Sequence, residues 1–307
     1  MLILILIKKI ISMFLVIAMG AAAVKLKLLS DTDSRPLSAV LLYISTPALL
    51  LTSFEVDVTP EVVSGLVLAF LAAILTHIVY MLLLIPLEKA MKLEAVEKMT
   101  VIYGNAGNLI IPLVQAMYGE EYVIYTCAFI AVQQFCLWSH GRVLLEGKKK
   151  IDFRQVFLNL NVICIILGMV IFVTGFRFLT PIDDGLKMVG NLFTPVSMLV
   201  TGMLIGSKDL KALVNYKRVW LMTGMRLVAM PAVIFFIYKF TPLASLASNG
   251  ETILTISLMA AASAAAGSIT QMATIYGGDT QYSSAVNIIS TLCCIVTIPA
   301  YVWLFSL

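Results

Sequence analysis

Long apolar runs, separated by short polar loops, repeat along the whole chain. Most runs are about 17–25 residues long, which is the length that a helix needs to cross the hydrocarbon core of a bilayer. The pattern predicts ten transmembrane helices, at about 10–27, 36–54, 61–86, 97–117, 122–145, 154–175, 186–206, 217–240, 252–275 and 281–305. We therefore expect an all-α polytopic membrane protein.

The composition is that of a membrane protein rather than a soluble one. Of the 307 residues, 61% are hydrophobic and only 12% are charged, and the mean hydropathy is +1.00. A soluble domain of this length would need far more charge on its surface. The net charge of +4 comes from Lys and Arg scattered through short loops, so it does not indicate a nucleic-acid interface. The five Cys lie inside predicted spans without metal-ligand spacing, and we expect free thiols.

The N-terminus allows two interpretations. Lys8 and Lys9, followed by an apolar run and then small residues, could form a secretory signal. An internal repeat favours a retained first helix instead. IAMG at 17 matches IILG at 165, and STPALLL at 45 matches FTPVSML at 193, both at the same spacing. AMYGEEY at 116 matches TIYGGDT at 274 at a spacing of 158 residues. A polar loop then separates two five-span repeats, 1–145 and 154–307.

Positive residues are distributed unevenly between the two sides of the predicted spans. Loops that follow spans 1, 3, 5 and 7 hold fifteen Lys and Arg, and the opposite side holds five. Cytoplasmic loops are the more positive ones, so both termini are predicted to lie outside. Because each repeat has five spans, the second repeat enters the membrane in the inverted direction. An inverted repeat can exchange inward-open and outward-open states of similar energy, as alternating access requires.

Span 4 contains the stretch YGNAGNLIIP, which interrupts the apolar pattern where a helix should be most regular. Gly104, Gly107 and Pro112 weaken the helix there. A break that faced lipid would leave backbone groups unpaired at several kcal/mol each, so this one is expected to line a cavity or to be covered by protein. Asn105 and Asn108 could bond the freed backbone or a ligand.

Span 9 carries small and polar residues at the corresponding place, namely Gly267, Ser268, Thr270 and Gln271. Two interrupted helices in an inverted repeat predict a binding site at the middle of the membrane. The N-termini of the half-helices present unpaired N–H groups that suit a carboxylate. The alternative is that these residues only allow close helix packing.

Four motifs carry a resemblance to a known family. They are GNAGNLIIPLVQAMYGEE in span 4, NLFTPVSMLVTGMLIG in span 7, RLVAMP in span 8 and IYGGD after span 9. With these motifs in this order, the chain resembles the auxin efflux carrier family, which includes plant PIN carriers and bacterial malonate and malate permease-like proteins. The resemblance covers essentially the whole chain.

The resemblance implies a ten-helix fold like that of bile acid/sodium symporters, with spans 4 and 9 as crossed broken helices. The scaffold would comprise 10–54 and 154–206, and the transport domain 61–145 and 217–307. A homodimer through the scaffold and a place in the bacterial inner membrane are also implied. In plant carriers an Asn of an N-x6-P pattern and a Gln four residues before a Trp line the site; the matching residues are Asn105 with Pro112, and Gln134 with Trp138.

The chain departs from the family pattern in span 9, where Ala264 and Ser268 replace the Pro and Asn of a Pro-x3-Asn crossover. Predicted substrate contacts are Asn105, Asn108, Gln133, Gln134, Ser268 and Gln271; predicted crossover residues are Gly104, Gly107, Pro112, Gly267 and Thr270; further candidates are Thr46, Arg226 and Thr291.

Several of these candidates have alternative roles. Gln133, which the spacing of 158 pairs with Thr291, could line the cavity or join two helices. Asn287 and Ser290 in span 10 are interpreted as packing residues. Arg226 could counter an anionic substrate or pin helix ends.

The predicted function is secondary transport of small organic anions by alternating access, with mono- or dicarboxylates, including auxin-like acids, as substrates. The alternatives are a sodium-coupled symporter of the same fold and a membrane sensor. All seventeen Asp and Glu fall in loops or at predicted helix ends, so no buried carboxylate is expected to carry a proton. His-Glu-x-x-His and Gly-x-Ser-x-Gly motifs are absent and only His77 and His140 occur, so no catalytic residue, cofactor or metal site is expected.

Overall fold

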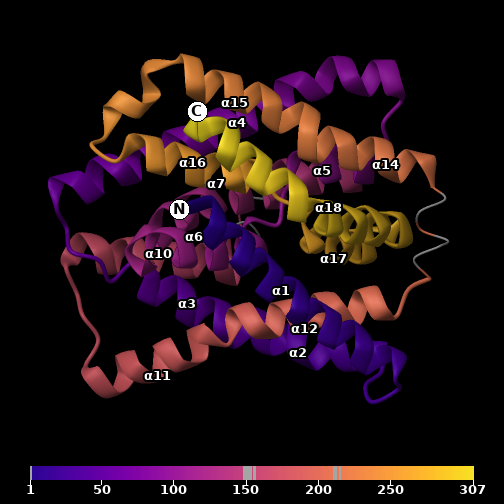
Figure 1. Ribbon diagram of the computed structural model, residues 1–307, viewed down its shortest axis with the longest axis horizontal. Helices are drawn as coiled ribbons and strands as arrows, with labels where there is room; N and C mark the ends of the chain where they lie inside the picture. The colour runs from indigo at the N-terminus through magenta and orange to yellow at the C-terminus, as the bar shows by residue number, and fades with distance from the viewer. Residues whose placement is uncertain (1, 148–153, 155–156, 210–212, 214–215) are drawn as a thin grey trace.

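The chain folds into packed helices, as a computed structural model shows (Figure 1). The structure describes residues 2–147, 154, 157–209, 213 and 216–307. Within these ranges, seven helices are long and apolar enough to cross a membrane, and three shorter helices are apolar as well. The strand-like pairing found in the same ranges is an isolated antiparallel bridge between Gly104 and Ala265. The prediction of an all-α polytopic membrane protein is confirmed at this level.

Helices and short helical turns make up the first half of the chain. Its elements are α1 (Leu2–Lys25), η1 (Asp31–Asp33), α2 (Ser34–Val40), η2 (Leu41–Ser45), α3 (Thr46–Ser53), α4 (Pro60–Met91), α5 (Ala95–Ile102), η3 (Ala106–Ile110), α6 (Ile111–Tyr118), η4 (Glu120–Tyr122), α7 (Val123–Cys136), η5 (Leu137–Gly141) and α8 (Arg142–Glu146). Helix α4 continues to Met91, beyond its predicted end at 86. The C-cap residue, Lys92, adopts a left-handed conformation.

The second half of the chain is helical as well. Its elements are α10 (Leu160–Thr174), α11 (Thr180–Asn191), α12 (Phe193–Gly206), α14 (Lys217–Gly224), η6 (Met225–Ala229), α15 (Met230–Phe240), η7 (Pro242–Leu246), α16 (Gly250–Ala261), α17 (Gly267–Tyr276) and α18 (Thr280–Ser306). Helix α11 begins at Thr180, before the predicted start at 186, because Pro181 occupies its first turn, where a missing N–H costs nothing.

Three of the spans contain a widened, π-helical turn directly before a proline. The turns are η2, η3 and η6, and the prolines are Pro47, Pro112 and Pro231 in the first two positions of the following helix. Proline lacks the N–H of a regular turn, and its ring collides with the turn before it. The wider turn makes room for the ring. Thr46 adds a hydrogen bond by donating from Oγ1 to the carbonyl of Leu41 (2.7 Å).

Helices α1 and α12 pack closely against each other, on the side of the molecule that also holds α3 and α11 (Figure 1). Glycine makes this close approach possible. A Cβ on Gly20 or Gly202 would collide with a carbonyl oxygen of the other helix, and a Cβ on Gly206 would lie 2.6 Å from the carbonyl oxygen of Ala21. The hydrophobic effect does not drive helices together in lipid, so close van der Waals packing through small residues stabilises such contacts instead. On the opposite side lie α4, α14, α15 and α16.

We expect Gly202→Ala to reduce the free energy of unfolding in detergent by about 1–3 kcal/mol, because the added methyl group meets the backbone of α1 and has no room to move. The measurement is chemical denaturation followed by tryptophan fluorescence.

Gly185→Ala is the matched control. A Cβ at Gly185 in α11 meets nothing within 4 Å, so this change is expected to leave stability the same or slightly higher. Equal losses in the two variants would contradict the packing described for α1 and α12.

Candidate functional site

Two helices are interrupted deep in the protein, and the interruptions meet. The chain leaves the helical conformation at 103–105, between α5 and η3, and again at 262–266, between α16 and α17. Gly104 and Ala265 pair there as an antiparallel bridge. Two backbone hydrogen bonds flank the pair, from the N–H of Asn105 to the carbonyl of Ala264 (2.7 Å) and from the N–H of Ala266 to the carbonyl of Tyr103 (3.1 Å). We call this meeting point the crossing.

Side chains of α7 and α18 bond the backbone groups that the crossing frees. Gln133 donates from Nε2 to the carbonyl of Gly104 (2.7 Å) and accepts at Oε1 from the N–H of the same residue (3.3 Å). At the second interruption, Ser290 accepts from the N–H of Ala265 (3.0 Å) and Asn287 donates to its carbonyl (2.5 Å). The N–H and carbonyl groups of Gly104 and Ala265 are therefore bonded inside the protein, as a break in a membrane requires.

This pairing shows which residues the sequence reasoning missed. Asn287 and Ser290 were interpreted as packing residues, but both bond the second interruption. The spacing of 158 pairs Gln133 with Thr291, whereas the structure gives Gln133 and Ser290 the corresponding tasks. A repeat spacing shorter by one residue would have pointed to Ser290, and it would also have paired Gln134 with Thr291.

Arg226 in η6 bonds the C-terminal ends of α5 and α16, the half-helices that precede the two interruptions. Its side chain is 1% exposed. Nε donates to the carbonyl of Ser263 (2.8 Å), and Nη1 donates to the carbonyls of Ile102 (2.9 Å) and Val101 (3.2 Å). These carbonyls carry the negative ends of the dipoles of α16 and α5. These hydrogen bonds pin the ends of α5 and α16, which is one of the two roles considered for Arg226.

Arg226 leaves no room for a side chain at position 104, which is therefore glycine. A Cβ on Gly104 would collide with Nη2 of Arg226 and with Oγ of Ser263. The guanidinium group also lies over the ring of Tyr80, with 5.9 Å between Cζ and the ring centroid. A permanent positive charge is thus packed directly against the crossing.

The N-terminal ends of the other two half-helices lack such partners. Gly107 and Gly267 lie in the first turns of η3 and α17, and no hydrogen bond holds their N–H groups within the part of the chain that the structure describes. A Cβ on either residue would meet nothing closer than 3.8 Å, the distance to Phe193 at Gly107. The side chains of Asn105 and Asn108 are half-buried beside the first of these ends.

The remaining predicted residues differ in their burial and in their hydrogen bonds. Gln134 and Thr291 have a buried oxygen (Oε1 and Oγ1) that finds no partner among the residues that the structure describes. Ser268 is half-buried in the first turn of α17. Thr270 already shares a hydrogen bond with Ser283 (2.8 Å), and Gln271 is exposed. Of the crossover residues, Gly104 lies in an interruption, whereas Gly107, Pro112 and Gly267 lie in the helices that follow.

One buried carboxylate contradicts the expectation that there is none. Glu97 in α5 is 3% exposed. It pairs with Arg218, which also donates from Nη2 to Oε2 (2.7 Å), and it accepts from the hydroxyl of Tyr282 (3.1 Å) and the N–H of Glu94 (2.9 Å). The sequence places Glu97 at a helix end, and the capping box at Glu94 folds its side chain back toward the protein. Its charge is fully paired by α14 and α18.

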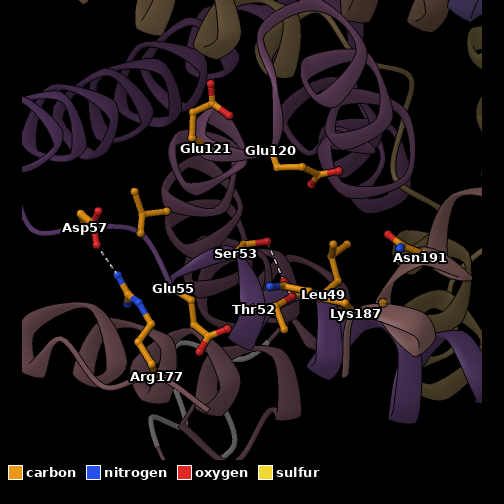
Figure 2. Close-up of a pocket in the computed structure, with 12 residues that line it drawn as sticks. Leu49, Thr52, Ser53, Glu55, Asp57, Glu120, Glu121, Arg177, Lys187 and Asn191 are labelled. Atoms are coloured by element: carbon orange, nitrogen blue, oxygen red, sulfur yellow. Dashed lines mark hydrogen bonds and ion pairs between the residues drawn. The ribbon is translucent and has the colours of Figure 1, made fainter. Parts of the chain in front are cut away.

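Two polar hollows that share part of their lining lie away from the crossing. One, of about 530 Å³, has Glu120 and Glu121 on one side and Glu55, Arg177 and Lys187 on the other (Figure 2). A second, of about 500 Å³, shares part of its lining with the first, namely Leu49, Glu120, Gly190 and Asn191. We call the two hollows together the vestibule. None of the predicted site residues lines it.

Phe193 lies between the vestibule and the crossing. Its neighbours Thr194 and Pro195 line the vestibule, whereas its own ring is 5% exposed and lies 3.8 Å from the Cβ position of Gly107. One aromatic side chain of α12 therefore lies next to the N-terminal end of η3, whose N–H groups lack hydrogen bonds.

We expect Gln133→Met to lower the free energy of unfolding by about 2–6 kcal/mol, because it leaves the buried N–H and carbonyl of Gly104 without partners. The measurement is chemical denaturation in detergent.

Gln271→Met, which replaces an exposed amide with the same side chain, is the control and should change stability by less than about 0.5 kcal/mol. A loss no larger for Gln133→Met than for this control would show that Gln133 does not bond the crossing.

Comparison with known proteins agrees with this membrane architecture. A sequence profile of the family described as "Membrane transport protein" matches residues 5–152 and 149–302, which together cover nearly the whole chain. No protein with a curated description matches the chain. The resemblance seen in the motifs of spans 4, 7, 8 and 9 is thereby confirmed. The chain belongs to the auxin efflux carrier family of membrane transport proteins.

Proposed function

We propose that the chain is a secondary transporter that carries small organic anions, mono- or dicarboxylates, by alternating access. The observation that carries this proposal is the crossing, where two half-helices present unbonded N–H groups while Arg226 neutralises the carbonyl ends of the other two. Helix N-termini bind anions through their N–H groups and their positive dipole ends. In the interior of a membrane protein, such groups are retained only where they have a partner, and an anion supplies one.

Polar side chains beside the open N-termini fit a carboxylate cargo. The amides of Asn105 and Asn108 make no hydrogen bond to the described residues, and the half-buried Gln134 adds a further amide. Amide N–H groups of such side chains can donate to carboxylate oxygens. In this proposal Asn105, Asn108, Gln134 and Ser268 contact the anion, and Gln133 positions the backbone that surrounds it.

The proposed architecture has ten transmembrane helices in a 5+5 inverted repeat, with the bile acid/sodium symporter-like division into scaffold (10–54 and 154–206) and transport domain (61–145 and 217–307). The vestibule supports this division, because α3 and α11 line one side of it and α6 and η4 the other. Movement of the transport domain past the scaffold would carry the crossing past Phe193. The proposal places both termini outside a bacterial inner membrane and joins two copies through the scaffold.

Two alternatives lead to different results in reconstituted vesicles. A sodium-coupled symporter would show uptake that rises with sodium at a fixed membrane potential, in comparison with choline. A sensor would bind a carboxylate and move none. Our proposal predicts uptake that persists in choline.

A thermal-shift screen of mono- and dicarboxylates on purified protein identifies a substrate, and uptake of the best binder into proteoliposomes then tests the proposal. Protein-dependent uptake of that acid is the expected result. Folded protein that neither binds nor moves any carboxylate of the screen would contradict it.

We expect Asn105→Ala and Gln134→Ala each to reduce carboxylate uptake about tenfold without preventing folding, because each removes a hydrogen bond to a charged group worth about 1.5 kcal/mol or more. Uptake is measured at equal amounts of reconstituted protein.

Asn191→Ala removes an amide from the vestibule instead and should leave uptake within about twofold of wild type. Wild-type uptake in both Asn105→Ala and Gln134→Ala would remove these two residues from the site.

A further inference from the structure

Arg226 is a buried charge without a carboxylate partner. Its hydrogen bonds go to three carbonyl oxygens and to the hydroxyl of Ser263. Among the residues that the structure describes, no ion pair joins it to Asp or Glu. Glu97, the buried carboxylate in α5, is paired with Arg218. Buried charges in membranes are costly and are usually balanced, so the balance of charge around Arg226 needs an explanation.

The helix ends at the crossing allow this balance to be counted. Each helix end carries about half an elementary charge, negative at the carbonyl end and positive at the N–H end. The carbonyl ends of α5 and α16 together carry about one negative charge, and the guanidinium of Arg226 cancels it. The N–H ends that begin at Ala106 and Gly267 together carry about one positive charge, which no acidic side chain described here contacts.

We propose that Arg226 is the fixed counter-charge of the transported anion. The crossing then takes one negative charge per cycle, and the empty crossing moves as a net cation. This inference rests on the proposed function, and it narrows the cargo to monovalent organic anions, chiefly monocarboxylates.

The cost of moving charge through the membrane explains the preference for one charge. A transport domain with Arg226 and one monoanion is neutral, whereas a dianion leaves it with one negative charge. Net charge in the low-dielectric barrier is unfavourable, so the monoanion crosses more easily.

The same count makes the return of the empty domain sensitive to voltage. A unit charge that crosses the whole membrane potential shifts an equilibrium by about fifty-fold per 100 mV. An inside-negative potential would therefore draw the empty crossing toward the cytoplasmic side, where it can load again.

The competing interpretation is that Arg226 only pins helix ends, with its charge fully cancelled or compensated elsewhere. The hydrogen bonds are the same in both cases, so stability alone does not separate them. Charge does. Arg226→Lys keeps the positive charge and Arg226→Gln removes it.

The test needs no substrate. Gln115 in α6 lines the vestibule, so the labelling rate of Gln115→Cys by a membrane-impermeant maleimide reports which face is open. Proteoliposomes without organic anion are held at −100 or +100 mV by potassium gradients and valinomycin. Labelling of the same protein without the added cysteine is subtracted, because the chain has five cysteines of its own.

We expect the labelling rate of Gln115→Cys to differ at least about fivefold between the two potentials, which is a small part of the full fifty-fold per 100 mV. Adding Arg226→Lys should keep this difference, and adding Arg226→Gln should reduce it below about twofold. Arg177→Gln is the control, because Arg177 pairs with Asp57 at the vestibule and its loss should leave the difference intact.

Equal labelling at both potentials in the protein with Arg226 would overturn the inference, and so would an unchanged voltage effect in Arg226→Gln. If Arg226→Gln does not fold, the measurement on the protein with Arg226 still decides, because it can show equal labelling by itself.

Paired acids test the charge of the cargo and separate this inference from the proposed function. Monomethyl succinate and succinate differ by one charge at similar size. We expect the monoester to half-saturate the thermal shift at a concentration at least about tenfold lower than succinate does. This ratio corresponds to a difference in binding free energy of about 1.4 kcal/mol. Tighter binding of succinate would overturn the inference and leave an anion carrier. If neither acid binds and none is transported, the proposed function fails, while Arg226-dependent labelling by voltage would still support a moving charge.

Discussion

The structure depends on how an interrupted backbone is kept bonded inside a membrane. Arg226 binds the carbonyl ends of α5 and α16, and Gln133 and Ser290 bond the backbone of Gly104 and Ala265. Each of these contacts replaces a hydrogen bond that a regular helix would have made for itself. Because all of them come from other helices, the crossing can form only when α7, η6 and α18 are packed around it. The helices α7, η6 and α18 therefore form a frame that supports the two interruptions.

That frame leaves an asymmetric site. The carbonyl ends are covered and neutralised, while the N–H ends of η3 and α17 are open and have amide side chains beside them. A site of this kind discriminates by charge more than by shape, since an anion gains from both the N–H groups and the dipole ends. In the proposed transporter, specificity among anions would then come from the groups around the site, including Phe193 and the vestibule.

Much of the fold could be predicted from the sequence, because apolar runs of about the thickness of a bilayer report helices directly. The interruption in span 4 was visible in Gly104 and Asn105, since neither suits the middle of a helix. The second interruption was displaced: it lies in a run of small residues at 262–266, one turn before the polar group that begins at Gly267. Bonds such as that from Gln133 to Gly104 join residues far apart in the chain, so local pattern cannot give them. Glu97 was misjudged for the same reason, because Arg218 and Tyr282 bury it from distant helices.

The most direct test of the central claim is to locate a bound anion. A crystal structure of the protein with 4-iodobenzoate would show the iodine through its anomalous scattering and the carboxylate beside it. The account predicts carboxylate oxygens within hydrogen-bond distance of the N–H groups of Gly107 and Gly267. Iodobenzoate bound in the vestibule alone, with the crossing unchanged, would contradict it.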